Sequence, residues 1–596
     1  MSVIREIYIS NFRGIKELKW WPNLGINCLI GPGDGGKSTI LDAIELAIGS
    51  KQSFSFTDAD FHRCNIEQPI IIDVTLGELE DDLRNIEAYG HFLRGRDSQT
   101  GEIHNETSAA HETVLTVRLI VRDDLEPQWL LFSEGAAAEG RERNLQWKHR
   151  QKIAPTRLGT VASHHMALGP RSVLGKISQD KAQASAALAA ASRQARKAFA
   201  DQGCDGVDEI LTTAARIVGN MGIPVETVSA LLDVRGATFS GGAIALHDDD
   251  QVPLKSLGSG SLRLLVAGLQ KAVGQSSISI IDEVEFGLEP YRIIRLLDAL
   301  GAKTNDQTQQ VFMTTHSPVV LRELSSVQLF AVRTRRSVIP AVVVDGIEQQ
   351  PAQATTENGL FSLGIGEDAQ KTLRACAEAF LAPNVIVCEG KTEIGLLRGR
   401  DLWGQSQNQR SILAHGCHWA DGGGSSMIER AKIFVRMGYR TALFMDSDVA
   451  YDAGVYTDLT TQGVSVFRWQ DGYSTEAALF ASVPAAQVVN LLNIACEWRS
   501  EDSINGKIQH VSGGLYSLQS CRDNFSGDMR QVLGQCAGDG KWFKDIEPAE
   551  RAIREVLAPV WQNTNPLFTG PLNAISDWIM ASHTVQVVHN NNGGQE

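Results

Sequence analysis

Gly31-Pro-Gly-Asp-Gly-Gly-Lys-Ser38 is the stretch of sequence that decides the fold of this chain. It has the spacing GxxxxGK[ST] of a phosphate-binding loop. The apolar run Ile26 to Ile30 precedes it, and apolar residues at helical spacing follow from 40 to 48. Glycines let backbone N–H groups converge on phosphate oxygens, and the N-terminus of the following helix adds a favourable dipole. The sequence therefore predicts a strand, a loop and a helix that together bind a nucleotide.

The residues of this loop have distinct expected roles toward ATP. Lys37 is expected to reach the β- and γ-phosphates, and the Ser38 hydroxyl to coordinate the Mg²⁺ that accompanies the nucleotide. Chance matches to the motif occur, but the strand before it and the helix after it supply the context that the chemistry needs. The residues expected to bind ATP here are Gly31, Gly33, Gly35, Gly36, Lys37, Ser38 and Thr39.

A second nucleotide-related motif lies much further along the chain. Ser277-Ile-Ser-Ile-Ile-Asp282-Glu283 is a short apolar strand that ends in two acids, the pattern of a Walker B motif. Asp282 is expected to hold Mg²⁺ through water, and Glu283 to polarise the attacking water. The alternative is a buried strand that ends in two surface acids. The presence of the phosphate-binding loop in the same chain favours the Walker B interpretation.

Two stretches around this motif resemble elements of ABC-class ATPases. Leu257-Gly-Ser259-Gly260-Ser resembles the signature motif, which caps the γ-phosphate bound by the opposite subunit, although it departs from the usual LSGGQ. After Glu283, the apolar strand that ends at Thr315 delivers His316 to the place of the ABC switch histidine. We expect His316 to sense the γ-phosphate, against the alternative of a structural histidine.

The first residues also resemble ABC proteins, in particular their SMC and RecF branch. Asn11-Phe-Arg13-Gly14 is similar to the opening of those proteins, where the arginine contacts the nucleotide. No coiled coil of several hundred residues separates the two Walker motifs, so a cohesin-like arm is excluded. Arg13 is accordingly a further expected ATP ligand.

The length of 596 residues predicts two to four domains. An Ala-, Gln- and Ser-rich stretch of helical periodicity interrupts the ATPase region, and we expect it to be a dimerisation insertion. The expected domains are 1–165 and 239–347 for the ATPase, 166–238 for the insertion, 348–380 for a linker, 381–585 for a second α/β domain with C-terminal helices, and 586–596 for a flexible tail.

Composition restricts the partners and the compartment. A net charge of −15 argues against a protein that coats nucleic acid without specificity. Local basic runs at 333–336 and 141–152 are candidates for a DNA-binding groove, with a solvated surface as the more ordinary interpretation. No run of about 18 apolar residues occurs, so no membrane span is expected. The scattered cysteines and the lack of a secretory signal predict a cytoplasmic protein.

The C-terminal third places acids at the ends of two apolar strands. Val385-Ile-Val-Cys-Glu389 leads to Glu393, and the i, i+4 spacing brings these two carboxylates together on one helical turn. Ala442-Leu-Phe-Met-Asp446-Ser-Asp448 ends another strand. In a parallel sheet these acids meet at the carboxyl edge, where their repulsion requires divalent cations. Two such metals can activate water and stabilise the leaving oxygen in phosphodiester cleavage.

The order of strand-Glu and then strand-DxD resembles the Toprim domain, which has a Rossmann-like parallel sheet. Gly422-Gly-Gly424 between the two motifs is similar to the Gly-rich turn of that domain. An ABC-type ATPase followed by Toprim, in a chain of this length, resembles the OLD (overcoming lysogenisation defect) family of nucleases, with class 2 and Gabija nucleases as the nearest types. The fold class expected is therefore α/β throughout.

The OLD resemblance implies an ATP-hydrolysing DNA endonuclease of phage defence or DNA processing. It implies two divalent cations, Mg²⁺ or Mn²⁺, and a lysine near the C-terminus that stabilises the scissile phosphate. Lys541 and Lys544 both fit, and spacing does not choose between them. It also implies a homodimer, DNA as substrate, and a UvrD-like helicase partner for Gabija-type members. The metal ligands carried over, with Asp452 as an additional candidate, are Glu389, Glu393, Asp446, Asp448, Glu476 and Asp452.

Two other function classes stay open at the level of sequence. One is a RecF- or SMC-like DNA-binding ATPase clamp without nuclease activity, against which the complete acidic set argues. The other is strand-passage or primase chemistry. Type II topoisomerases need a nucleophilic tyrosine domain, and none of the eight tyrosines lies in a recognisable context for one.

Overall fold

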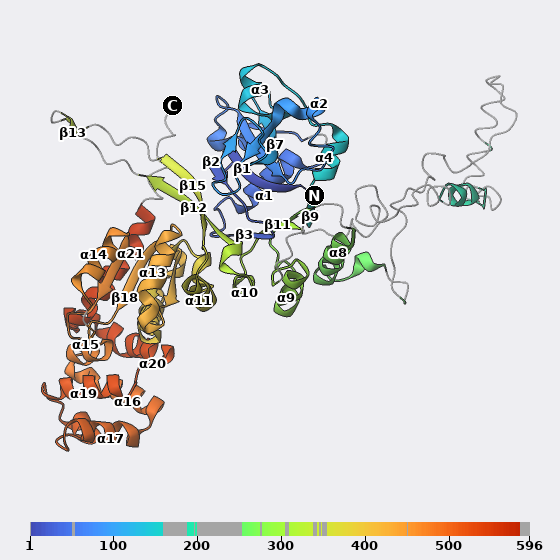
Figure 1. Cartoon of the computed structure of the whole chain (residues 1–596). Coiled ribbons are helices and arrows are strands. Elements are labelled where there is room, and N and C mark those ends of the chain that lie inside the picture. The colour runs from blue at the N-terminus through green and yellow to red at the C-terminus, as the bar shows by residue number, and fades with distance from the viewer. Residues whose placement is uncertain are drawn as a thin grey trace, which may run out of the picture.

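The structure is a computed structural model of the chain (Figure 1). The residues that it describes are 2–50, 54–158, 188–195, 197–198, 212, 249, 253–273, 277–303, 309–337, 343–344, 347–348, 355–449 and 451–584. The expected dimerisation insertion, 166–238, lies outside them except for residues 188–195, 197–198 and 212. The expected flexible tail, 586–596, lies outside them entirely.

The phosphate-binding loop belongs to a six-stranded sheet with the order β15-β12-β3-β11-β10-β9. Its strands are β3 (Ile26–Ile30), β9 (Thr156–Leu158), β10 (Ile278–Ile281), β11 (Gln310–Thr314), β12 (Leu329–Ser337) and β15 (Thr355–Ser362). All pairs are parallel except β12 with β15. The strands expected at 26–30, 278–281 and 311–314 are confirmed. Because parallel strands direct their carboxyl ends to one edge, the loops after β3, β10 and β11 meet there.

A seven-stranded antiparallel sheet covers the other side of the helix that follows the loop. The path β2-β1-β4-β7-β5-β6, with β8 on β7, uses β1 (Val3–Phe12), β2 (Ile15–Trp20), β4 (Ile70–Gly77), β5 (Leu93–Arg96), β6 (Ile103–His104), β7 (Glu112–Val121) and β8 (Pro127–Phe132). Helix α1 (Lys37–Ile48) buries Ile40, Leu41 and Ile44 in a cluster that includes residues of both sheets. The loop is therefore anchored by a helix held between two sheets.

Short helices complete the ATPase region. They are α2 (Ile86–Tyr89), α3 (Glu134–Ala138), α4 (Trp147–Ile153), α8 (Ser259–Val273), α9 (Pro290–Ala299) and α10 (Pro318–Glu323). Helix α9 begins with proline at its first position, which the absent N–H and fixed φ of proline favour. Its buried face packs into the same cluster as β10 and β11.

The C-terminal region is built on a four-stranded parallel sheet with the order β17-β16-β18-β19. Its strands are β16 (Asn384–Cys388), β17 (Cys417–Asp421), β18 (Arg440–Met445) and β19 (Val464–Arg468). The apolar strands expected at 384–388 and 441–445 are confirmed, and the sheet is parallel as expected. Both acidic motifs therefore follow adjacent strands at one edge.

Helices cover this sheet and extend away from it (Figure 1). Those beside the strands are α12 (Lys391–Ser406), α13 (Met427–Arg436), α14 (Ala453–Thr461) and α15 (Thr475–Ser482). The rest are α16 (Val488–Arg499), α17 (Glu501–Val511), α18 (Leu518–Asp523), α19 (Met529–Asp539), α20 (Ile546–Arg551) and α21 (Pro566–Thr584). Helices α12, α15 and α16 to α21 form one buried apolar cluster with one face of the sheet, whereas α13 and α14 pack in the cluster that also contains residues of the ATPase region.

The stretch expected to be a linker, 348–380, contains regular structure, which corrects that expectation. Strand β15 pairs with β12 from Phe330↔Ser362 to Ser337↔Thr355, and α11 (Glu367–Ala375) follows. The polar Gln/Thr/Asn composition suggested a linker, but β15 is the last strand of its sheet, where polar side chains are tolerated. The two regions are joined by packed structure, and β12 and β15 run between them in Figure 1.

One hydrophobic cluster crosses this junction. It contains Leu321 of α10, Leu373 of α11, and Phe380 and Phe434 beside the C-terminal sheet. Gln370 reinforces it, since its side chain accepts from Ser326 N (2.8 Å) and donates to the Leu324 carbonyl (3.2 Å).

No single described helix is a candidate membrane span, because none alone has both the length and the apolar character to cross a bilayer. The consecutive helical segments Thr475–Ser482 and Ala485–Arg499 meet the criterion only when taken together, and they are bent by 117°.

Two helical glycines give a matched test of the C-terminal packing. A Cβ on Gly395 of α12 would lie 2.4 Å from the Ile546 carbonyl oxygen, whereas a Cβ on Gly506 of α17 would meet nothing within 4 Å. We expect Gly395→Ala to lower the free energy of unfolding by about 1–3 kcal/mol through overpacking. Gly506→Ala should raise it by about 0.5–1 kcal/mol, because alanine favours the helix. Urea unfolding of both variants measures this, and equal effects would contradict the close packing of α12 on α20.

Candidate functional site

The phosphate-binding loop holds Lys37 in a buried position. Its Nζ donates to the carbonyls of Gly31 (3.0 Å) and Pro32 (2.7 Å). Burial is the main reason that the pKa of Lys37 is lowered to about 8, although nearby Asp282 opposes the shift. A nucleotide phosphate would restore the charge balance and replace the two carbonyls as the partner of the ammonium group.

The glycines of this loop satisfy backbone requirements. Gly31 has φ 138° and Gly36 has φ 89°, conformations that other residues rarely adopt. A Cβ on Gly31 would also lie 2.7 Å from the Val332 carbonyl oxygen of β12. Gly36 directly precedes α1, so the first N–H groups of the helix open onto the loop.

Asp282 lies opposite Ser38 across the sheet edge. Its Oδ1 accepts hydrogen bonds from Ser38 Oγ (3.1 Å) and Thr314 Oγ1 (2.6 Å). A hydroxyl and a carboxylate at this spacing are the oxygen donors that Mg²⁺ uses beside a nucleotide. The structure thus brings together the two residues that the sequence predicted for this ion.

Hydrogen bonds between the carboxyl ends of β10 and β11 position Glu283 and His316. Glu283 is exposed, has φ 47°, and donates its N–H to Thr314 Oγ1 (2.8 Å). A non-glycine residue in the left-handed region is strained, and such strain clusters at functional sites. Glu285 accepts from both Thr315 Oγ1 (2.7 Å) and His316 N (2.6 Å). The carboxyl ends of β10 and β11 are therefore bound to each other.

The signature-like segment packs on the loop that follows Glu283. A Cβ on Gly260 would lie 2.4 Å from the Gly287 carbonyl oxygen, so only glycine fits there. Arg263 of α8 is fully buried and donates to the carbonyls of Glu283 (3.1 Å) and Phe286 (2.8 Å). Ser259 begins the helix at this contact. Its expected role toward a second subunit stays a prediction.

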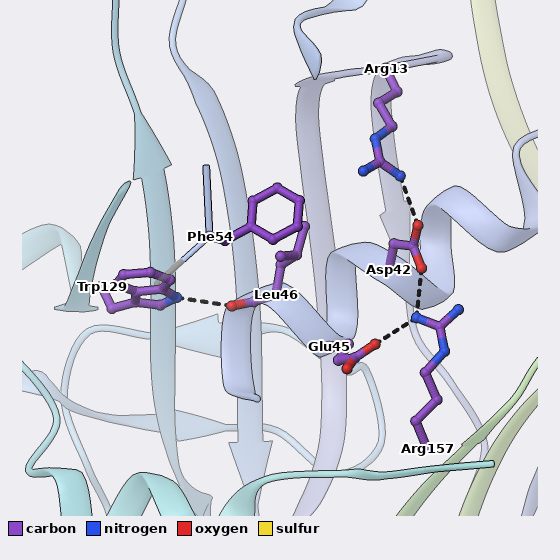
Figure 2. Close-up of a pocket in the computed structure, with 7 residues that line it drawn as sticks. All are labelled: Arg13, Asp42, Glu45, Leu46, Phe54, Trp129 and Arg157. Carbon is purple, nitrogen blue, oxygen red and sulfur yellow. Dashed lines mark hydrogen bonds and ion pairs between the residues drawn. The ribbon is translucent and has the colours of Figure 1, made fainter. Parts of the chain in front are cut away.

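Arg13 lies beside α1 at a small cavity of about 230 Å³ (Figure 2). It pairs with Asp42 (2.7 Å) and Asp60 (3.0 Å), and Asp42 also binds Arg157 (2.7 Å). Arg157 in turn lies 3.6 Å from Asp282. Leu46, Phe54 and Trp129 form the apolar wall. An ion-pair chain therefore connects Arg13 to the expected Mg²⁺ ligand, and direct contact of Arg13 with nucleotide stays a prediction.

A second polar centre lies where β16 and β18 end. Glu389 Oε2 accepts from Asp446 N (2.8 Å), and Glu393 Oε2 accepts from Gly390 N (3.0 Å) at the start of α12. Thr475 Oγ1 donates to Glu393 Oε1 (2.7 Å) and also closely contacts Asp446 Oδ1. Because a hydroxyl has one proton, it serves one carboxylate at a time. Both contacts are satisfied together when a carboxyl group is itself protonated.

The pKa values at this centre are raised. Burial is the largest cause for Glu393, whose pKa is raised from 4.5 to about 8, with the charge of Asp446 adding to it. Burial likewise raises the pKa of Glu389 and of Asp446, with neighbouring carboxylates contributing to both. A divalent cation would reverse these shifts because it favours the ionised form of each ligand.

Glu476, the acid expected from the S/T-x-E pattern, is 1% exposed, and neither carboxylate oxygen has a hydrogen-bond partner. Lys544 Nζ lies 4.0 Å from its Oε1. Burial alone would lower the pKa of Lys544, but the surrounding carboxylates raise it. A buried carboxylate that lacks hydrogen bonds is costly, so these oxygens fit cation ligands. Of the two lysines left open by the sequence, Lys544 is the one beside the acids.

The remaining expected residues lie at the rim. Asp448 is exposed two residues beyond Asp446. Asp452 is exposed and caps α14 by accepting from Gly454 N (3.1 Å). Lys541 is exposed, and Arg499 donates to its carbonyl oxygen (2.7 Å). The structure assigns these last two a local role, and it gives neither a contact with the buried acids.

The glycine turn of residues 422–424 is hydrogen-bonded to the backbone at Glu389, one of the acids of this centre. Gly422 N donates to the Cys388 carbonyl (2.6 Å) and Gly424 N to the Glu389 carbonyl (2.9 Å). A Cβ on Gly422 would lie 2.4 Å from the Cys388 carbonyl oxygen. This turn therefore fixes the backbone of Glu389 from the neighbouring strand.

One known protein family matches the part of the chain that contains the first of these sites. Residues 26–322 match the family described as "AAA domain, putative AbiEii toxin, Type IV TA system". The matched range includes the phosphate-binding loop, Asp282 and His316. Residues 26–322 form an ATPase domain of this family. The ATPase domain thus contains every motif that the sequence assigned to nucleotide binding except Arg13.

Individual relatives match this chain more weakly. The uncharacterized protein MJECL10 of Methanocaldococcus jannaschii is 48% identical over 54 residues, which are 9% of this chain and only 24% of that protein. Similar solved structures include an SMC head bound to the C-terminal winged-helix domain of ScpA, with 12% identity over 60% of this chain and 98% of that one and a TM-score of 0.33. The SMC head domain from Thermotoga maritima has 14% identity, coverage of 61% and 99%, and a TM-score of 0.27. RecF has 14% identity, coverage of 56% and 96%, and a TM-score of 0.30.

Several residues of both centres were missed by sequence reasoning. In the ATPase domain they are Thr314, Glu285, Arg263 and Arg157, and in the C-terminal centre the main one is Thr475. Thr475 stands between Ser474 and Glu476 in the S/T-x-E pattern, so its position was a usable signal. Arg263 and Arg157 contact residues distant in sequence, and no local pattern marks them.

Two of the basic residues considered for a DNA groove are buried, so the prediction that they bind DNA is wrong. Arg333 is 5% exposed, stacks on the Tyr439 ring (3.4 Å) and donates to the Ala382 carbonyl (3.1 Å). Arg150 is also buried, over Trp129, and donates to the Gly49 carbonyl (2.8 Å). Their long side chains pack on aromatic rings inside the fold. Neither is available to a DNA backbone.

The raised pKa of Glu393 predicts a pH dependence of the metal-free protein. The unfolded chain loses this proton near pH 4.5, and the folded chain keeps it to about pH 8. Between these values the folded state binds more protons, so stability should fall as pH rises and level off above pH 8. Thermal unfolding in chelator across this range measures the slope. Glu393→Gln should flatten it, and the exposed Glu547→Gln should not; an unchanged slope in Glu393→Gln would contradict the assignment.

Proposed function

We propose that this chain is an ATP-hydrolysing, divalent-metal-dependent DNA endonuclease of the OLD type, with its nuclease centre in a C-terminal Toprim domain. The observation that carries the proposal is a cluster of acids beside Lys544, in which Glu393, Asp446 and Glu476 are buried and Glu389 is half-buried. Such a set has no stabilising role of its own, because like charges repel and burial penalises each. Cation binding would offset this repulsion and would explain why the acids lie together.

Glu389, Glu393, Asp446, Asp448 and Glu476 would hold the cations. When bound, Mg²⁺ or Mn²⁺ at such a centre activates water and stabilises the leaving oxygen of a phosphodiester. The protein's own contribution is placement: Thr475 and Gly390 fix the buried carboxylates, and Asp448 is exposed to solvent. Lys544 is half-exposed, so its ammonium group can reach a scissile phosphate.

In the ATPase domain, the roles follow from the site geometry. Lys37 would bind the β- and γ-phosphates, Ser38 and Asp282 would hold Mg²⁺, and Glu283 would polarise the attacking water. DNA and a second copy of the chain are the proposed partners, the second copy because Ser259 and Gly260 can cap a γ-phosphate only across a dimer. The helicase partner implied by the Gabija resemblance stays a prediction.

The competing proposal is a DNA-binding ATPase clamp without nuclease activity. The ATPase domain is equally compatible with both. The unpartnered oxygens of Glu476 favour the nuclease, since a clamp has no use for a buried carboxylate that lacks hydrogen bonds. Supercoiled plasmid with Mg²⁺ or Mn²⁺ separates them: nicked or linear product supports the nuclease, and intact plasmid supports the clamp.

Separate variants should disable the two activities. Asp446→Asn should lower plasmid cutting by about 10²-fold or more because a cation ligand is lost, and it should leave ATP hydrolysis near wild type. Lys37→Ala should lower ATP hydrolysis by about 10²-fold or more because the phosphates lose their counter-charge. Plasmid cutting and phosphate release are measured on the same preparations.

The control for Asp446→Asn is Asp458→Asn, an acid of the same region that pairs with Lys432 on the surface. It should retain both activities. Wild-type cutting by Asp446→Asn would overturn the nuclease proposal, and wild-type ATP hydrolysis by Lys37→Ala would overturn the nucleotide site independently.

The two C-terminal lysines form a second matched pair. Lys544→Ala should lower cutting by about 10²-fold, because the charge beside Glu476 is lost. Lys541→Ala should cut at close to the wild-type rate, since Lys541 is exposed and its described hydrogen bonds are made by its backbone. Single-turnover cleavage of a nicked-circle substrate compares them, and a larger defect in Lys541→Ala would reverse the assignment.

A further inference from the structure

The antiparallel sheet carries a polar cluster that neither proposed centre uses. Strand β5 pairs with β6 through Gly95↔His104 and with β7 through Arg96↔Glu112. Asp97 follows β5 directly, and His111 directly precedes β7. Because side chains alternate along a strand, Gly95, Asp97 and His104 face the same side, and His111 continues the row opposite Asp97.

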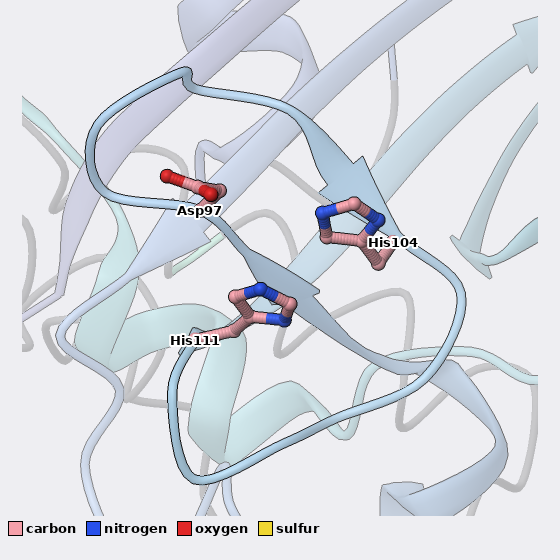
Figure 3. A group of neighbouring side chains, drawn as sticks. All are labelled: Asp97, His104 and His111. Atoms are coloured by element: carbon pink, nitrogen blue, oxygen red, sulfur yellow. The ribbon is translucent and has the colours of Figure 1, made fainter.

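Gly95 makes room for the His111 imidazole in the middle of this row. A Cβ there would lie 3.1 Å from both Cβ and Nδ1 of His111 and 2.6 Å from the Glu106 carbonyl oxygen. The rings of His104 and His111 lie 4.6 Å apart between centroids at an interplanar angle of 17° (Figure 3). Any larger residue at position 95 would displace His111.

His111 Nδ1 is buried and has no hydrogen-bond partner. A buried ring nitrogen normally has one, so this atom needs a ligand. The Asp97 carboxylate would bind the same ligand. Its Oδ1 accepts hydrogen bonds from Gln99 N (2.7 Å) and Thr100 N (3.0 Å), which hold the side chain in place.

We infer that Asp97, His104 and His111 form a binding site for one transition-metal ion of the zinc class. One ligand atom from each residue lies within 4.8 Å of the others. Metal–ligand distances of about 2.0–2.1 Å require the side chains to close somewhat further around the ion. Two imidazoles and a carboxylate suit Zn²⁺ or Co²⁺, whereas Mg²⁺ and Ca²⁺ prefer all-oxygen sets.

The site would fasten the edge of the sheet. Asp97 begins the turn between β5 and β6, and His111 ends the loop between β6 and β7. An ion held by residues from both connections ties the two-residue strand β6 to its neighbours. Since the unfolded chain does not bring these ligands together, metal binding stabilises the folded state. This inference is independent of the proposed nuclease function.

The test uses the full-length, tag-free protein, stripped with chelator and then dialysed against Zn²⁺ in excess Mg²⁺. The wild type should retain one more zinc per chain than His111→Ala or His104→Ala, measured by elemental mass spectrometry. Exposed His510 supplies the control, because His510→Ala should match the wild type. Co²⁺ should give a visible absorption band in the wild type that both cluster variants lack.

Asp97→Asn keeps the folding test separate from the metal test. The amide oxygen can still accept from Gln99 and Thr100, so the metal-free melting temperature should stay near wild type, while zinc affinity falls at least about tenfold. Zinc should raise the melting temperature of the wild type more than that of Asp97→Asn. Equal zinc content in wild type and His111→Ala, or equal affinity in Asp97→Asn, would overturn the site and leave the histidines as a stacked pair.

Discussion

Acidic groups at the carboxyl ends of parallel strands are the constraint on which both centres depend. A parallel sheet sends the residues after β10 and β11, or after β16 and β18, to one edge, so Asp282 meets Ser38 and Asp446 meets Glu389. Where carboxylates gather in this way, as at Glu389 and Asp446, they repel one another and each loses hydration on burial. The surrounding fold supplies rigid supports, Arg263 in one centre and Thr475 in the other, that hold the charges in place despite their repulsion.

Local sequence patterns predicted the parts of this fold that are written in consecutive residues. Apolar runs predicted the strands at 26–30, 278–281 and 384–388. The glycine-rich loop predicted the helix after Gly36. Strand β15 was not predicted, because it lies at the edge of its sheet, pairs with one strand and has a polar sequence. The choice between Lys541 and Lys544 needed tertiary structure, since Thr392 holds the Phe543 carbonyl and thereby sets which lysine reaches Glu476.

Long arginine side chains show the limit of charge as a sequence signal. A basic run suggested a surface for DNA, but Arg333 and Arg150 lie on aromatic rings in the interior. The histidines of the antiparallel sheet show the opposite limit. His104 and His111 are separated by an unremarkable loop, and only the register across β5 reveals that they face each other.

Strand β12 gives the molecule a mechanical property that its chemistry alone does not suggest. The Val332 carbonyl leaves no space beside Gly31, and the next residue, Arg333, rests on Tyr439, which immediately precedes β18. β18 ends at Asp446. A continuous series of close contacts therefore runs from the phosphate loop to the strand that precedes Asp446. A shift at either end would have to be accommodated along this path, because close-packed interiors have low compressibility and transmit strain.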